Sequence, residues 1–123
     1  MPHPRLLWAA MDEQKALEEV KGAVVLALDN RRGLVAFGRL EARELDQQAR
    51  TVEREALEQV RKLLPAAPTS PLLLQLKTRL DRMDEALQAL AGRKEISDRS
   101  RALERDDITW RAFEDISWLV ENP

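Results

Sequence analysis

The sequence has no cysteine, one histidine, and few glycines and aromatic residues among its 123 positions. Without cysteine there are no disulfides, thiolate metal ligands or cysteine nucleophiles. The single histidine, His3, lies between two prolines near the start of the chain, so histidine metal clusters and serine–histidine triads are excluded too. We therefore predict no catalytic residue, no metal site and no cofactor.

Long apolar runs and glycine-rich loops are also missing. No run approaches the roughly 20 residues that a membrane-spanning helix needs, and the apolar run at 6–11 meets acidic residues too soon for a secretory signal. The four glycines are scattered and form no phosphate-binding loop. We expect a cytoplasmic protein with no membrane partner.

The composition that remains is typical of helices. Charged residues make up 34% of the chain, and leucine and alanine supply most of the apolar content. Arginine outnumbers lysine, which we attribute to a GC-rich, bacterial genome. A chain of this length forms one core, so we predict a single helical domain over residues 1–123.

The clearest periodic pattern lies in residues 70–92. Ser70 and Pro71 supply a helix N-cap and a first-turn proline, and Gly92 suits a left-handed C-terminal closure. Between them, apolar residues alternate at spacings of three and four, which predicts a coiled-coil-like seam. The seam consists of Leu73, Leu76, Leu80, Met83, Leu87 and Leu90.

A second amphipathic helix is predicted from about Leu34 or Leu40 to Leu64. The prolines at 65–71 cannot continue a helix, so we predict a hairpin turn there. The two helices would then form one long antiparallel hairpin. Because two shorter helices would leave its tip uncovered, we expect a homodimer.

The N-terminal part is less clear. Residues 1–5 should be a loose tail, and a helix should begin near Asp12 and reach Leu28. Two short apolar runs then flank residues 29–33, which predicts a turn between two helices ending at Gly33. The alternative is an α+β fold with a small β-hairpin at about residues 24–38. No third strand candidate is present, so we favour an all-α four-helix bundle.

Residues 93–106 are almost all charged or small, which predicts an exposed linker or a short solvated helix. A last helix should begin at Asp106 or Asp107. It contains the only internal repeat that we found, in which Asp107-Ile-Thr-Trp110 recurs eight residues later as Asp115-Ile-Ser-Trp118. At about 100° per residue the two tryptophans lie about 80° apart, so this helix is apolar over more than one face.

Carboxylates at helical spacing are the remaining candidates for catalysis. Gathered in a bundle, they could bind Mg²⁺ as in all-α nucleotide pyrophosphohydrolases. The sets are Glu41 with Glu44, Glu55 with Glu58, and Asp81 with Asp84 and Glu85. If Leu80 lies on the seam, Asp81 points away from it, so we keep a Mg²⁺-dependent hydrolase only as the second alternative.

DNA binding is the first alternative, because basic residues cluster around a possible helix-turn-helix at Gly33 and again at 93–105. Acidic residues interrupt both clusters and weaken the attraction for phosphate, so we do not expect nucleic acid as a partner.

The aromatic residues are the best remaining candidates, because aromatic side chains are enriched at the centres of protein interfaces. Trp8 is one of them, but the last helix carries most. The alternative is that Trp8, Trp110, Phe113 and Trp118 pack in the core, which is the more common role of aromatic residues in a small helical protein. We predict a small non-enzymatic adaptor, chaperone-like or regulatory protein that acts through protein–protein contact. The predicted partner-binding residues are Trp110, Phe113, Ile116 and Trp118.

Overall fold

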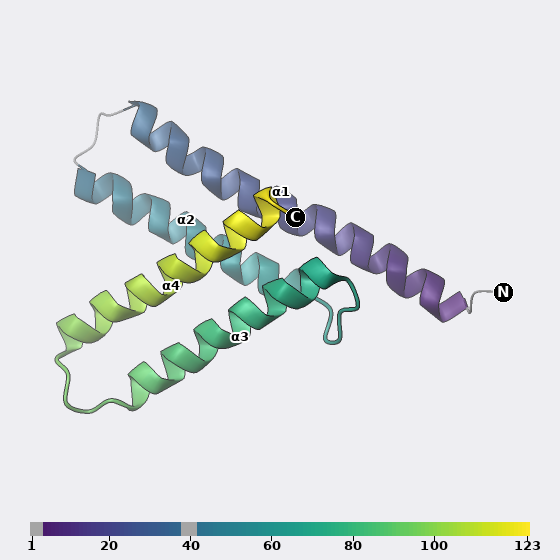
Figure 1. The fold of residues 1–123 in the computed structure, drawn as a ribbon. Coiled ribbons are helices and arrows are strands. Elements are labelled where there is room, and N and C mark those ends of the chain that lie inside the picture. Colours follow the sequence, from purple (N-terminus) through teal and green to yellow (C-terminus); the bar gives the residue numbers. More distant parts are fainter. Residues whose placement is uncertain (1–3, 38–41) are drawn as a thin grey trace.

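The computed structural model describes residues 4–37 and 42–123, and the side chains of residues 13–34, 44 and 46–123. These residues form four helices, α1 (Pro4–Phe37), α2 (Ala42–Leu63), α3 (Pro71–Gly92) and α4 (Asp98–Glu121), and no strand (Figure 1). The predicted all-α four-helix fold is confirmed. None of the described helices combines the length and apolar content needed to span a membrane.

The helices are arranged as two antiparallel pairs. Figure 1 shows α1 beside α2 and α3 beside α4, with the second pair running at an angle across the first. Helix α4 is the inner member of its pair and packs against both α1 and α2. The N-terminal part of α1, drawn in purple, extends beyond the crossing.

All four helices contribute to one hydrophobic core. The seam predicted on residues 70–92 is largely confirmed, because Leu73, Leu76 and Leu80 are buried in α3. Small residues contribute to this core as well, because Ala27 of α1 and Ala56 of α2 are buried in it. Small side chains let two helix axes approach closely. The largest fully buried side chains are Phe113, Leu57, Leu73, Leu76, Ile116, Val20, Val24 and Val60.

The expected break in residues 29–33 was wrong, and so was the alternative β-hairpin as far as residue 37. Helix α1 continues through Gly33 to Phe37, and residue 38 lies outside the described residues. The physical reason is that the buried face of Val20, Val24 and Ala27 continues to Arg31, which is held by a carboxylate on α2. Of the predicted loose tail, residues 1–3 lie outside the description and Pro4 and Arg5 belong to α1.

The predicted pairing of the second and third helices was also wrong. The non-helical residues 64–70 do interrupt the helices, but they connect the two antiparallel pairs. Helices α2 and α3 meet through core side chains and through an ion pair, in which Arg61 Nη1 lies 2.5 Å from Asp84 Oδ2. The homodimer was argued from the uncovered tip of the predicted hairpin, so that argument no longer applies and the homodimer stays a prediction.

The ends of α3 use other residues than expected. Ser70 occupies the N-cap position, but its side chain makes no capping hydrogen bond. Instead the Glu13 carboxylate of α1 accepts hydrogen bonds from the Ser70 and Thr69 backbone N–H groups at 3.2 and 2.5 Å. Gly92 is the last helical residue and not a left-handed cap. The Arg101 guanidinium donates to the Leu90 carbonyl oxygen at 2.5 Å and also to that of Arg93.

The last helix begins earlier than expected. Residues 93–97 are not helical, whereas residues 98–106, expected in a charged linker or short solvated helix, form the first part of α4. The Ser97 hydroxyl accepts a hydrogen bond from the Ser100 backbone N–H at 3.1 Å, which satisfies one of the free N–H groups of the first turn. The start predicted at Asp106 or Asp107 is therefore two turns too late.

Candidate functional site

The four residues predicted to bind a partner lie on three different sides of α4. Phe113 and Ile116 are 1% and 0% exposed and belong to the core. Trp110 is half-buried and packs against that core. Trp118 is 63% exposed. The structure thus places one of the four side chains fully on the surface, and the expected contact set does not form one continuous face.

Trp110 is held in place by an aromatic and a cationic neighbour. Its ring stacks on Phe113 with centroids 6.1 Å apart and an interplanar angle of 25°. The Arg31 guanidinium of α1 lies over the ring, with Cζ 4.4 Å from the ring centroid. A cation at this distance is attracted by the electrons of the ring face. Trp110 therefore connects α4 to α1.

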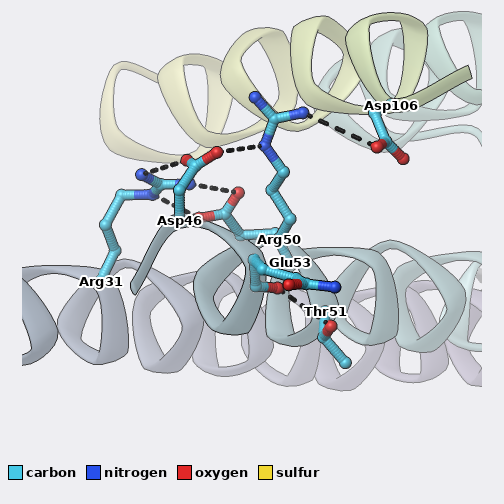
Figure 2. A network of polar contacts seen from close by, with 7 residues as sticks. Arg31, Asp46, Arg50, Thr51, Glu53 and Asp106 are labelled. Carbon is cyan, nitrogen blue, oxygen red and sulfur yellow. Dashed lines mark hydrogen bonds and ion pairs between the residues drawn. The ribbon is translucent and has the colours of Figure 1, made fainter. Parts of the chain in front are cut away.

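Arg31 is also the centre of a charge network between α1 and α2 (Figure 2). Its Nε donates to Glu53 Oε1 at 2.5 Å and its Nη2 donates to Glu53 Oε2 at 3.3 Å. Nη1 lies 3.5 Å from an Asp46 carboxylate oxygen. The hydrogen bonds that Arg31 donates to Glu53 raise the pKa of Arg31 above its ordinary value, so the guanidinium stays charged.

The same network reaches α4 through Arg50. Its Nε lies 2.9 Å from Asp46 Oδ2, and its Nη1 lies 4.0 Å from Asp106 Oδ2 on α4, as Figure 2 shows. A cavity of about 10 Å³ opens beside it, lined by Arg50, Glu53, Arg54, Asp106, Thr109 and Trp110. This volume holds about one water molecule, which is too little for an organic substrate. The arrangement joins three helices and leaves no room for a reactant.

Trp118 has a different environment. Glu114 and Asp115 precede it by four and three residues, and Glu121 follows it by three. Residues at these spacings are neighbours on a helix surface, with Cβ atoms about 5–6 Å apart. Asp115 pairs with Arg79 of α3 at 3.8 Å, and Glu121 pairs with Arg32 of α1 at 3.5 Å. The exposed indole therefore has three acidic residues within one turn, two of which are paired with arginines of α3 and α1.

The carboxylate sets considered for Mg²⁺ are engaged elsewhere or lie apart. Asp84 accepts from two guanidinium nitrogens of Arg61, at 2.5 and 2.8 Å, and this contact lowers the pKa of the Asp84 carboxyl. Asp81 pairs with Lys77 at 2.9 Å. Among the described residues no group of three or more histidine, aspartate or glutamate side chains could hold a metal ion. Glu41 and His3 lie outside the described residues.

Several arginines of the basic clusters considered for DNA binding make ion pairs or hydrogen bonds within the fold. Arg31 points inward to Glu53, and Arg32 pairs with Asp29 and Glu121. In the second cluster Arg93 pairs with Glu95 and Glu104. Arg39, Arg43 and the side chain of Trp8 lie outside the description. The described part of neither cluster presents an uninterrupted basic surface.

The contact between Arg31 and Glu53 was not predicted from the sequence, although a signal was present. Glu53 is 2% exposed because it lies on the same side of α2 as Ala49, Ala56 and Val60. A charged residue within an apolar stripe requires a partner, since burying an unpaired charge is strongly unfavourable. The identity of that partner depends on how the helices pair.

Comparison with protein-family models, curated proteins and solved structures finds no match to the chain.

Proposed function

We propose that this protein is a non-enzymatic adaptor, chaperone-like or regulatory protein of the cytoplasm, which acts by binding another protein through a surface centred on Trp118. The observation that carries the proposal is the 63% exposure of this indole in the last turns of α4. Burying a tryptophan is a large source of binding free energy, and tryptophan is enriched among the residues that dominate interfaces.

The neighbouring core supports this assignment. Ile116 and Val120, on the inner side of α4, are buried at 0% and 6% exposure, so the helix that presents Trp118 is fixed to the bundle. A preorganised helix loses little conformational freedom when it binds, which favours affinity. In this proposal Phe113 and Ile116 fix α4 to the core and do not contact the partner. The proposed contact residues are then Trp118 and its exposed neighbours.

The test is a comparison of three tagged forms of the protein in an extract of the source organism: wild type, Trp118→Ala, and Leu26→Ala. Leu26 is 71% exposed on α1 and is the matched control for the loss of an exposed apolar side chain. We expect at least one captured protein to fall about tenfold with Trp118→Ala, as an interface residue worth about 1.4 kcal/mol would require. Quantitative mass spectrometry measures the captured proteins.

The melting temperatures of the variants show whether a loss of captured protein comes from the contact surface or from unfolding. Because Trp118 contributes little to the core, Trp118→Ala should stay within about 2 °C of wild type. A capture profile unchanged by Trp118→Ala would contradict the proposal. So would a large drop in melting temperature, which would make Trp118 part of the folded core.

A further inference from the structure

The internal repeat of α4 is longer than the four residues that first identify it. Asp106-Asp-Ile-Thr-Trp110 and Glu114-Asp-Ile-Ser-Trp118 share an acidic residue, aspartate, isoleucine, a hydroxyl residue and tryptophan. Each tryptophan therefore has carboxylates four and three residues before it. On a helix both positions are adjacent to the tryptophan side chain. The two copies offer the same chemical groups, about 80° apart around one helix.

In the first copy these groups are surrounded by arginines. Arg31 lies over the Trp110 ring at 4.4 Å, and its guanidinium is held at the same time by Glu53. The acidic pair of the repeat binds two further arginines, since Asp106 lies 4.0 Å from Arg50 Nη1 and Asp107 lies 3.1 Å from Arg111 Nε. The guanidinium over Trp110 is thus held by carboxylates of α2, while the acidic residues of the repeat pair with other arginines. The first copy shows an arginine that stacks on the tryptophan and donates to a nearby carboxylate at the same time.

In the second copy the position over the ring is open. Among the side chains that the structure describes, no cation lies over Trp118, and Glu114 forms no ion pair. Asp115 makes a single ion pair to Arg79 at 3.8 Å, at the edge between α3 and α4. The indole and the Glu114 carboxylate are therefore both accessible to a side chain from outside.

We propose that Trp118 and Glu114 bind an arginine side chain of the partner protein. The inference rests on the proposed function, which it deepens by stating the chemistry of the partner. The guanidinium stacks on the indole while its N–H groups donate to the Glu114 carboxylate, as the Arg31 guanidinium does with Trp110 and Glu53.

Charge selects this occupant over others. Asp115 and Glu121 are paired with Arg79 and Arg32, so Glu114 is the carboxylate within one turn of Trp118 that remains for an outside cation. A negative charge beside the indole favours a basic side chain over nucleic-acid phosphates and acidic peptides. Arginine fits better than lysine because its planar, weakly hydrated group both stacks on a ring and donates to a carboxylate, whereas the ammonium group of lysine is compact and strongly hydrated.

The test uses a short glycine–serine peptide with one central arginine, and the same peptide with citrulline or lysine at that position. Citrulline keeps the shape of arginine and removes its charge. Resonances of the tryptophan indole N–H groups are followed by NMR, and the Trp118 signal is assigned by its loss in Trp118→Phe. We expect a saturable shift of this signal with the arginine peptide, and affinity about three- to fivefold lower with citrulline, as an exposed cation–π contact would give.

Glu114→Gln should lower the affinity for the arginine peptide about two- to threefold, since it removes the charge that orients the guanidinium. Glu55→Gln is the control, because Glu55 is an exposed glutamate on α2, far from α4 in sequence. It should leave the affinity unchanged. Both variants keep the melting temperature of wild type, because neither glutamate is buried.

The two contacts together imply a dissociation constant on the order of 100 mM. The proposal is overturned if the Trp118 signal does not move with the arginine peptide at up to about 200 mM and constant ionic strength. Equal shifts with citrulline, or a response to inorganic phosphate or duplex DNA, would overturn it too. A Trp118 shift on concentrating the protein alone would assign the surface to a second copy of the chain. If Trp118→Ala abolishes capture of a partner and Glu114→Gln does not weaken it, the proposed contact surface is supported and the proposed arginine site is contradicted. If the arginine peptide binds but Trp118→Ala leaves capture of every protein unchanged, the arginine site is supported and the proposed contact surface is contradicted.

Discussion

At the scale of single residues, Glu53 is a buried charged group whose stability depends on its ion pair. It is 2% exposed, and its two carboxylate oxygens accept from Arg31. Glu53→Gln would leave the half-buried Arg31 guanidinium facing a neutral amide, so we expect a loss of about 2 kcal/mol in the free energy of unfolding, typical of a hydrogen bond to a charged group. Urea denaturation monitored by circular dichroism measures it.

The control for this prediction is Glu58→Gln on the same helix. The Glu58 side chain is 61% exposed and lies 3.7 Å from Arg61 Nε, so removing its charge should change the stability by less than about 0.5 kcal/mol. Equal effects of the two substitutions would mean that the buried pair adds no more than a surface pair does.

Glu13 makes the stability depend on acid. Hydrogen bonds from the Thr69 hydroxyl and the backbone N–H groups of Thr69 and Ser70 hold the pKa of Glu13 below its ordinary value of 4.5. A carboxyl whose pKa is lower in the folded state stabilises the fold above its unfolded-state pKa, and this contribution is lost as the pH falls through the folded value. Urea midpoints should therefore fall less steeply below about pH 4.5 in Glu13→Gln than in wild type. Parallel profiles of the two proteins would contradict this reading.

Residue spacing separated the two tryptophans correctly but could not say which one is exposed. The eight-residue interval places Trp110 and Trp118 on different sides of α4, as the structure shows by half-burying the first and exposing the second. The sequence left open whether Phe113 and Ile116 face the core or a partner, and the structure buries both in the core. A periodic pattern identifies an apolar face, but the element that covers it is decided by long-range packing.

At the scale of helices, the two N-caps of α3 and α4 differ in a way that substitutions can measure. The Ser97 hydroxyl accepts from the Ser100 backbone N–H, whereas the Ser70 hydroxyl makes no capping bond. Ser97→Ala should therefore lower the free energy of unfolding by about 1 kcal/mol, and Ser70→Ala should be nearly neutral. Thermal unfolding of both variants checks this. Equal losses would show that Ser70 caps α3 in solution in spite of Glu13.

Helix ends were harder to predict than helix faces. The seam of α3 could be predicted from spacing alone, because apolar residues repeated every three and four positions indicate the buried face of a helix. Gly33 was taken as a helix end, yet tertiary contacts of Arg31 carry α1 past it. Residues 98–106 lack apolar periodicity, but Ser97 and the contact of Arg101 with the end of α3 make them helical. Local propensity is a weak guide wherever distant residues supply the stabilising contact.

At the scale of the whole molecule, Phe113 determines how the two helix pairs are held together. It is 1% exposed and lies in the core to which all four helices contribute. Phe113→Ala should remove about 3–5 kcal/mol of stability, a large part of the roughly 5–15 kcal/mol that a domain has. Denaturant unfolding measures this, with Trp118→Ala as the control expected within about 0.5 kcal/mol of wild type. Similar losses in both variants would be inconsistent with the burial difference.

The class of fold was predictable and the pairing of its helices was not. Composition and periodicity led to an all-α bundle without any knowledge of contacts. The long hairpin was assigned to the helices on either side of the prolines at 65–71, but those prolines connect the two pairs. Amphipathic helices of similar length present similar apolar faces, so their partners are chosen by the total packing of the core and not by the turn alone.

The pairing of sequence neighbours, α1 with α2 and α3 with α4, has a consequence for how the chain folds. Most contacts join residues close in sequence, and chains of such low contact order fold within microseconds to milliseconds. The core around Phe113 and Ile116 draws side chains from both pairs, so it is complete only after the two pairs have packed together. Helix α4 carries Trp118 and belongs to that shared core, so we expect the surface around this tryptophan to become rigid only when the two pairs have met.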